Sequence, residues 1–165
     1  MIQALYIVKF LFPFLLLALF FCLYKKDYGF MKRFYYRSVM SCNTRKFYRL
    51  ILLMMLIFLN WCSYMTDQNY AVGFAALMTI PFMFNKVADR ILHRLHESLR
   101  LLATTLILAM VCYTAPYMNS IFHVLFTVCV ASLFYPSERV LGMKSLPEFM
   151  SNYLARLNIA IKFYY

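Results

Sequence analysis

Residues 50–66, LILLMMLIFLNWCSYMT, contain no Asp, Glu, Lys or Arg. Arg49 precedes this stretch and the polar triplet Asp67-Gln68-Asn69 follows it. A helix needs roughly 17–25 predominantly apolar residues to cross the hydrocarbon core of a bilayer. The stretch has that length and composition, so we interpret it as a transmembrane helix, and this interpretation decides the fold class.

The whole chain has the composition of a membrane protein. It has 165 residues, of which 64% are hydrophobic and 14% are charged, whereas a soluble domain has about 45–50% apolar and about 25% charged residues. A single globular core cannot bury such an excess of apolar side chains, so lipid must cover the rest. We therefore predict an all-α fold, a polytopic membrane helical bundle that forms one domain over residues 1–165.

Turn signals and charges divide the chain into five expected spans. The first has neither a basic n-region nor an A-x-A cleavage site, so we expect it to remain uncleaved. Residues 101–137 lack Asp, Glu, Lys and Arg and are too long for one straight span, so Pro116 and Asn119 are expected to mark a turn. A re-entrant hairpin is the alternative for this region. The expected spans are residues 5–24, 50–66, 70–85, 101–115 and 121–135.

The distribution of Lys and Arg predicts the orientation of these spans. Short cytoplasmic loops collect such residues, and five spans place nearly all of them on one side, in residues 25–49, residues 86–100 and the C-terminal tail. The exception is Lys9. We expect the N-terminus outside and the C-terminus in the cytoplasm, in a plasma membrane of the bacterial inner-membrane type.

The connection over residues 25–49 mixes cations with aromatic rings. Tyrosine prefers the headgroup level, and Lys and Arg near the ends of spans reach toward lipid phosphates. We expect this connection to be partly helical, to lie on the inner leaflet and to bind anionic lipid headgroups, which accounts for the net charge of +11 without nucleic acid. The predicted membrane-interface anchor consists of Lys25, Lys26, Lys32, Arg33, Phe34, Tyr35, Tyr36, Arg37, Arg45, Lys46, Phe47, Tyr48 and Arg49.

The C-terminal tail predicts a second interfacial element. Ser145 and Glu148 fit a capping box, with Pro147 in the first turn. Apolar residues then recur at helical spacing. A charged helix with one apolar face lies in the membrane interface or docks on a partner, and we expect such a helix over residues 145–163.

Residues 86–100, KVADRILHRLHESLR, contain the densest group of ionisable side chains. We expect an amphipathic cytoplasmic helix with Asp89–His93 and Arg94–Glu97 pairs on its wet face. The zinc signatures HExxH and HxxEH are not matched, so no metal site is predicted. The expected apolar stripe steps by four residues through Val87, Ile91, Leu95 and Leu99. An alternative role is pH sensing by the cluster Asp89, His93, His96 and Glu97.

Polar side chains are few within the expected spans. No set of positioned acid, base and nucleophile can be assembled from them, so we predict neither an enzyme nor a cofactor. Residues that could line a pore or contact a partner are Asn60, Thr104, Thr105 and His123. A face of small residues for close helix packing is formed by Ala71, Gly73, Ala75 and Ala76.

These features favour a non-catalytic membrane protein that acts through helix–helix contacts with another membrane protein or with a second copy of itself. Accessory subunits of membrane machines and immunity or exclusion proteins belong to this class. Two alternatives stay open. One is an oligomeric channel or pore subunit, and the other is a membrane enzyme that acts on lipid through His93, His96 and the nearby carboxylates.

Overall fold

The structure, a computed structural model, describes residues 2–23, 28–66, 68–138 and 141. Within these ranges the chain forms seven α-helices and no strand, so the predicted all-α fold is confirmed. The predicted helix over residues 145–163 lies outside the described residues, as do Lys25 and Lys26. The helices are α1 (Ile2–Leu23), α2 (Gly29–Met40), α3 (Cys42–Thr66), α4 (Tyr70–Met83), α5 (Asn85–Glu97), α6 (Leu99–Thr114) and α7 (Asn119–Leu133).

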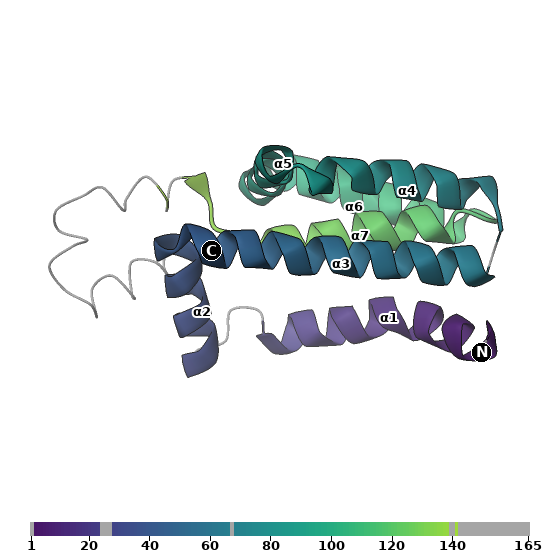
Figure 1. Cartoon of the computed structure of the whole chain (residues 1–165), viewed down its shortest axis with the longest axis horizontal. Helices are drawn as coiled ribbons and strands as arrows, with labels where there is room; N and C mark the ends of the chain where they lie inside the picture. The colour runs from purple at the N-terminus through teal and green to yellow at the C-terminus, as the bar shows by residue number, and fades with distance from the viewer. Residues whose placement is uncertain (1, 24–27, 67, 139–140, 142–165) are drawn as a thin grey trace, which may run out of the picture.

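The helices have two orientations. α1, α3, α4, α6 and α7 lie along the long axis of the molecule, whereas α2 and α5 lie across one end of this bundle (Figure 1). We call this end, which comprises α2, α5, the first two turns of α3 and residues 134–138, the polar end. α7 is the central helix, because it packs against α1, α3, α4, α5 and α6.

Helix length separates the bundle into two groups. α1 has 22 residues and α3 has 25, so they are about 33 and 37 Å long and exceed the roughly 30 Å of a bilayer core. α4, α6 and α7 have 14, 16 and 15 residues, which makes them about 21–24 Å long. Among the described residues, two helices are long and apolar enough to span a membrane, or up to three if α4 and α5 form one bent span. This finding is compatible with the predicted membrane protein, and the number of five spans remains a prediction.

The corner between α2 and α3 lies at Ser41. Its backbone N–H donates to the carbonyl of Arg37 at the end of α2, at 2.8 Å. Its hydroxyl accepts the backbone N–H of Thr44 in the first turn of α3, at 3.4 Å, which is the pattern of an N-cap. α3 therefore begins at Cys42, earlier than the predicted residue 50, because that prediction counted only the apolar part of the helix.

α4 and α5 meet at an angle of 102°. Pro81 lies in the last turn of α4, where it supplies no N–H, and Phe84 between the helices is extended with φ −92° and ψ 109°. The predicted apolar stripe of α5 is wrong in part, because Val87 and Leu99 are exposed. Leu99 belongs to α6, and α5 instead buries the face formed by Ala88, Leu92, His93 and Leu95.

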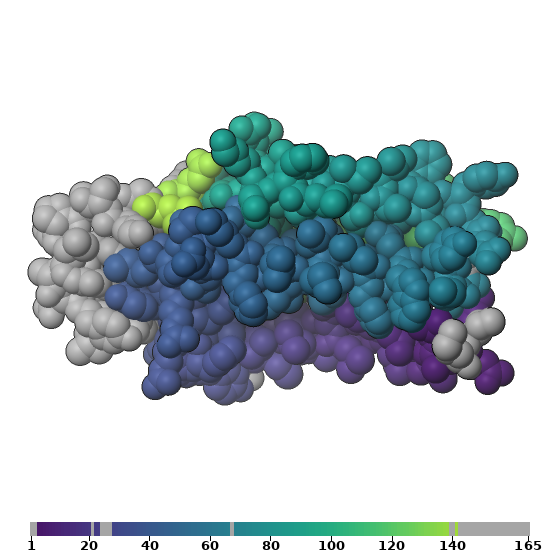
Figure 2. Space-filling view, in the orientation of Figure 1, coloured from purple at the N-terminus to yellow at the C-terminus, as the bar shows by residue number. Residues whose placement is uncertain are grey.

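The main core forms where α3, α4, α5 and α7 meet. Leu56 of α3, Ala75 of α4 and Leu92 of α5 are fully buried there, together with Val124 of α7. In the space-filling view, α3 occupies the middle of one face, between α1 and α4 (Figure 2). The outward faces of α1, α4 and α6 carry many exposed large apolar side chains, and lipid contact accounts for such faces.

Candidate functional site

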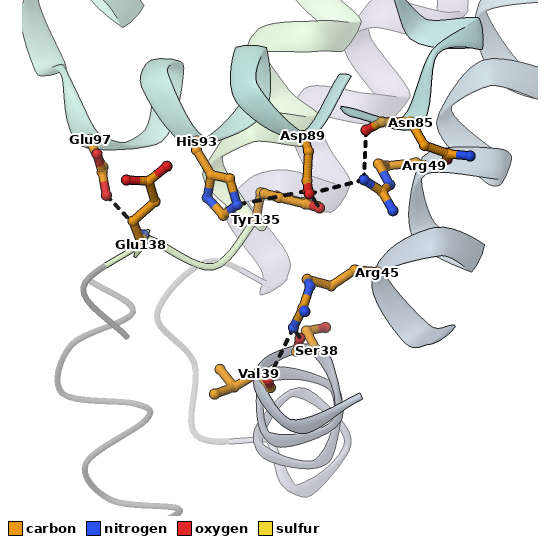
Figure 3. Close-up of polar contacts among 10 residues, drawn as sticks. All are labelled: Ser38, Val39, Arg45, Arg49, Asn85, Asp89, His93, Glu97, Tyr135 and Glu138. Carbon is orange, nitrogen blue, oxygen red and sulfur yellow. Dashed lines mark hydrogen bonds and ion pairs between the residues drawn. The ribbon is translucent and has the colours of Figure 1, made fainter. Parts of the chain in front are cut away.

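A polar network lies at the polar end, where α3, α5 and the segment after α7 meet (Figure 3). Arg49 of α3 places its Nη1 atom 3.1 Å from Oδ2 of Asp89 and donates to the carbonyl of Asn85 at 2.7 Å. The other carboxylate oxygen of Asp89 accepts a hydrogen bond from the hydroxyl of Tyr135. His93 Nε2 lies 3.7 Å from that same oxygen, so α5 supplies both the carboxylate and the imidazole.

This network is largely shielded from solvent. The side chain of Arg49 is 6% exposed and that of Asp89 is 36% exposed. A buried charge needs a partner, and Asp89 provides it for Arg49. Tyr135 is buried and lies beyond the last residue of α7. Burial, followed by the hydrogen bond to Asp89, raises the pKa of its hydroxyl well above the usual range, so Tyr135 remains a donor.

Aromatic contacts and caps extend the network to the end of α7. The rings of His93 and Tyr135 meet edge to face, with centroids 4.9 Å apart. The last carbonyls of a helix lack partners within the helix, and two of them in α7 find partners here. Tyr48 donates to the carbonyl of Ala131 at 2.8 Å, and Nδ1 of His96 lies 3.0 Å from the carbonyl of Ser132. These contacts fix α3 and α5 against the C-terminal turn of α7.

The four residues of the proposed pH-sensing cluster do not converge on one point. Asp89 and His93 face each other, whereas His96 contacts α7 and Glu97 accepts the backbone N–H of Glu138 at 2.8 Å. The expected wet-face position of His93 is wrong, because its side chain is buried against Tyr135. Within the described ranges, no three His, Cys, Asp or Glu residues come together as a metal site.

The predicted membrane-interface anchor divides into an inner and an outer group. Tyr35 and Arg49 are buried, and Arg45 donates to the carbonyls of Ser38 and Val39 at 2.9 and 3.0 Å, which ties α3 to α2 (Figure 3). Half-buried members of the set are Lys32, Phe34, Tyr36, Arg45 and Tyr48. The exposed members are Arg33, Arg37, Lys46 and Phe47.

The predicted polar-contact residues lie on α3, α6 and α7. Thr104 is exposed and donates to the carbonyl of Leu101 at 2.9 Å. Thr105 makes the same kind of bond and lies 3.2 Å from the sulfur of Cys129. His123 is buried against Phe122, with ring centroids 5.3 Å apart, and Asn60 is half-buried.

The small residues of α4 face in two directions. Ala75 is fully buried in the core, and Ala71 is half-buried. Gly73 and Ala76 are exposed, and a Cβ atom added at Gly73 would meet nothing within 4 Å. The close helix packing inside this chain therefore uses Ala75, and Gly73 points away from the bundle.

Two structural contacts were missed by sequence reasoning. Tyr135 is the last residue of the last expected span, and no sequence motif pairs it with Asp89. Lys9 stood out only as an exception to the charge rule, yet it is buried and its Nζ lies 3.3 Å from the hydroxyl of Thr66. Thr66 ends α3, and a cation is favourable at a helix C-terminus. The chain matches no protein-family model, and neither a curated protein nor a solved structure matches it.

Proposed function

We propose that this chain is a five-span protein of the bacterial inner membrane, with its N-terminus outside and its C-terminus in the cytoplasm. It acts without catalysis, through helix contacts with another membrane protein, as an accessory subunit or an immunity-type or exclusion-type protein does. Each of α1, α3, α4, α6 and α7 is one span in this proposal, and α2 and α5 lie in the inner interface.

The directions of the helices support this topology. α1 runs toward the polar end, α3 runs away from it, α4 returns, α6 leaves again and α7 returns (Figure 1). Exposed cations lie at the polar end on α2 and α5, among them Arg33, Arg37, Lys86 and Arg90. One leaflet interface can receive all of them, as the preference of cytoplasmic loops for Lys and Arg requires.

Thinning of the bilayer lets the short helices cross it. α6 and α7, at 16 and 15 residues, fall about 6–8 Å short of a core about 30 Å thick. Such a mismatch costs only fractions of a kcal/mol per Å. α5 covers the ends of the short helices at the polar end, because it packs against α4, α6 and α7.

The outward position of Gly73 is the observation that carries the proposed partner contact. Gly73 and Ala76 lie three residues apart on the exposed face of α4, next to the exposed side chains of Phe74 and Leu77. Small residues let a second helix approach the backbone closely inside a membrane. α4 already uses its opposite face, including Ala75 and Phe82, inside the bundle.

The test is site-specific photocrosslinking in native membranes. A photoreactive residue at Gly73 is expected to give a protein adduct of discrete mass, and Ala76→Leu is expected to weaken that adduct. Ala18 of α1 and Ala103 of α6 are exposed small residues on other helices and serve as matched control positions. Equal protein adducts from all three positions, or lipid adducts alone, would contradict the partner surface on α4.

The topology has an independent test in cysteine labelling from each side of the membrane. Cysteine at Arg37 is expected to react only from the cytoplasmic side, and cysteine at Asn69 or Tyr117 only from outside. Reaction of positions 37 and 117 from the same side would refute the five-span topology, whatever the crosslinking shows.

A further inference from the structure

An apolar cavity of about 510 Å³ lies between α1 and the rest of the bundle. Its walls come from α1, α2, α3 and α7, and they include Leu15 and Leu19 of α1, Phe30 and Phe34 of α2, Ile51 of α3 and Val130 of α7. The volume falls within the roughly 300–1,000 Å³ of small-molecule sites. It is too small for a partner helix, whose diameter with side chains is about 10–12 Å.

The cavity faces lipid. Leu15, Leu19 and Ile51 line it and are also exposed on the outside of the molecule. They belong to α1 and α3, the two helices that are long and apolar enough to span a membrane. A lipid chain can therefore enter the cavity sideways, between these two helices.

The length of the cavity matches one leaflet. Its lining follows α1 from Phe12 to Leu23, where α1 ends beside the polar end. Those residues rise about 16 Å at 1.5 Å each, which is close to half of the roughly 30 Å hydrocarbon core. A single acyl chain that starts at the interface would fill this depth.

Cations lie where the headgroup of such a lipid would sit. Phe30 lines the cavity and is also 72% exposed. Arg33 and Arg37 follow it three and seven residues later on the same face of α2, and both are exposed. α2 contains no acidic residue, as its sequence GFMKRFYYRSVM shows. Arginine binds phosphate through two parallel hydrogen bonds, and two exposed cations favour a phospholipid whose headgroup has a net negative charge.

We propose that this cavity binds one acyl chain of an anionic phospholipid, with the phosphate of that lipid held by Arg33 and Arg37. The site is formed by α1, α2, α3 and α7, so it is separate from the partner surface on α4, and either proposal can fail while the other stands. The bound lipid fills the gap beside α1 and fixes α2 against the end of the bundle.

The test measures lipid retained by the purified full chain. Wild-type protein is incubated with phosphatidylglycerol or phosphatidylcholine in mixed micelles, and bound lipid is counted by native mass spectrometry. Leu19→Trp fills the cavity from an exposed wall, and Leu17→Trp is the matched control, since Leu17 is exposed on the same helix but does not line the cavity. The expected result is loss of phosphatidylglycerol in Leu19→Trp and full retention in Leu17→Trp.

The headgroup contact is tested by charge. Arg33→Gln and Arg37→Gln are each expected to weaken phosphatidylglycerol retention about fivefold. Arg100→Gln is expected to leave it unchanged, because Arg100 is exposed on α6, a helix that does not line the cavity. Equal retention in the two tryptophan variants overturns the cavity as the binding site. Equal retention of zwitterionic phosphatidylcholine and anionic phosphatidylglycerol by the wild type overturns the preference for an anionic phospholipid.

A second measurement needs no variant and so does not depend on the folding of one. Phosphatidylglycerol with a photoreactive group in its acyl chain is crosslinked to the wild-type chain, and the adducts are mapped by peptide mass spectrometry. Adducts concentrated in residues 12–23, 48–55 and 127–134 support the site. Adducts spread evenly over α4 and α6 as well overturn it.

Discussion

Replacing Asp89 with Asn removes one negative charge from the polar network at almost constant volume. Arg49, 6% exposed, loses the carboxylate that lies 3.1 Å from its guanidinium. It keeps one neutral acceptor, the carbonyl of Asn85 at 2.7 Å. Tyr135 then donates to an amide oxygen, which is a weaker acceptor than the carboxylate that it replaces.

The loss of stability expected for Asp89→Asn follows from the exposed fractions of the Arg49 and Asp89 side chains. Removing one partner of a fully buried ion pair costs about 3–5 kcal/mol, and an exposed pair contributes about 0–1 kcal/mol. Arg49 belongs to the first class, but Asp89 is 36% exposed, so water relieves part of the loss. We therefore expect Asp89→Asn to lower the free energy of unfolding by about 2–3 kcal/mol.

The assay measures unfolding in mixed micelles. The fraction of a denaturing detergent in the micelles is increased, and the loss of helix is monitored by circular dichroism. Arg90→Gln is the control, because Arg90 neighbours Asp89 on α5 but is exposed, and its change should stay within about 0.5 kcal/mol. A double-mutant cycle with Arg49→Gln should give a coupling energy of about 1–3 kcal/mol. A coupling below about 0.5 kcal/mol would refute the idea that this pair joins α3 to α5.

Three further predictions use the same unfolding assay. Burial raises the pKa of Tyr135 in the folded chain, so the unfolded chain ionises first as pH rises, and stability falls above pH of about 10. Tyr135→Phe should lower the stability at neutral pH by about 1–3 kcal/mol, because Asp89 loses a hydrogen-bond donor, and should make the fall above pH of about 10 smaller. The hydroxyl of Thr127 is buried with no hydrogen-bond partner among the described residues, so Thr127→Val should stabilise the chain by about 1 kcal/mol, and a loss of stability would show that the hydroxyl is bonded. Tyr117 has a φ of 67°, which strains a residue with a Cβ atom, so Tyr117→Gly should raise the free energy of unfolding by about 1 kcal/mol. A lower free energy of unfolding would show that the tyrosine ring stabilises the chain by more than the backbone strain destabilises it.

Helices were predictable from the sequence because each one depends on local composition. The charge-free region from 101 to 137 forms two helices within two residues of the expected bounds, and the apolar run of residues 50–66 is helical but belongs to a helix that begins at Cys42. The buried face of α5 was not predictable in the same way. It depends on Tyr135, which lies 46 residues from its partner Asp89 and belongs to no repeating pattern. A stripe of four-residue steps therefore assigned His93 to solvent, although the ring of Tyr135 covers it.

The burial of the anchor residues was also not predictable from the sequence. Composition alone says nothing of the direction of a side chain, so the sequence predicts one common anchor for the cations and rings of residues 25–49. The start of α3 at Cys42 puts Arg45 and Arg49 on a helix that packs against α2 and α5, so both turn inward. Arg33 and Arg37 lie on the outer face of α2 and stay exposed. Sequence spacing gives the chemistry of such residues, and the packing of neighbouring helices decides which of them can reach lipid.

The unequal helix lengths explain why a charged network lies inside the polar end. From Arg49 to the end of α3 at Thr66 the helix rises about 25 Å, which is close to the full length of α6 or α7. Arg49 therefore lies at the level where the short helices end, and the residues of α3 before it extend past them. Arg49 at that level is 6% exposed and lies against apolar helices, so it needs a fixed partner. α5 meets this need because the break at Phe84 turns it across the bundle and brings Asp89 to within 3.1 Å of Arg49. The bend, the short helices and the buried ion pair are thus parts of one arrangement, in which α5 closes the bundle at the level where its short helices end.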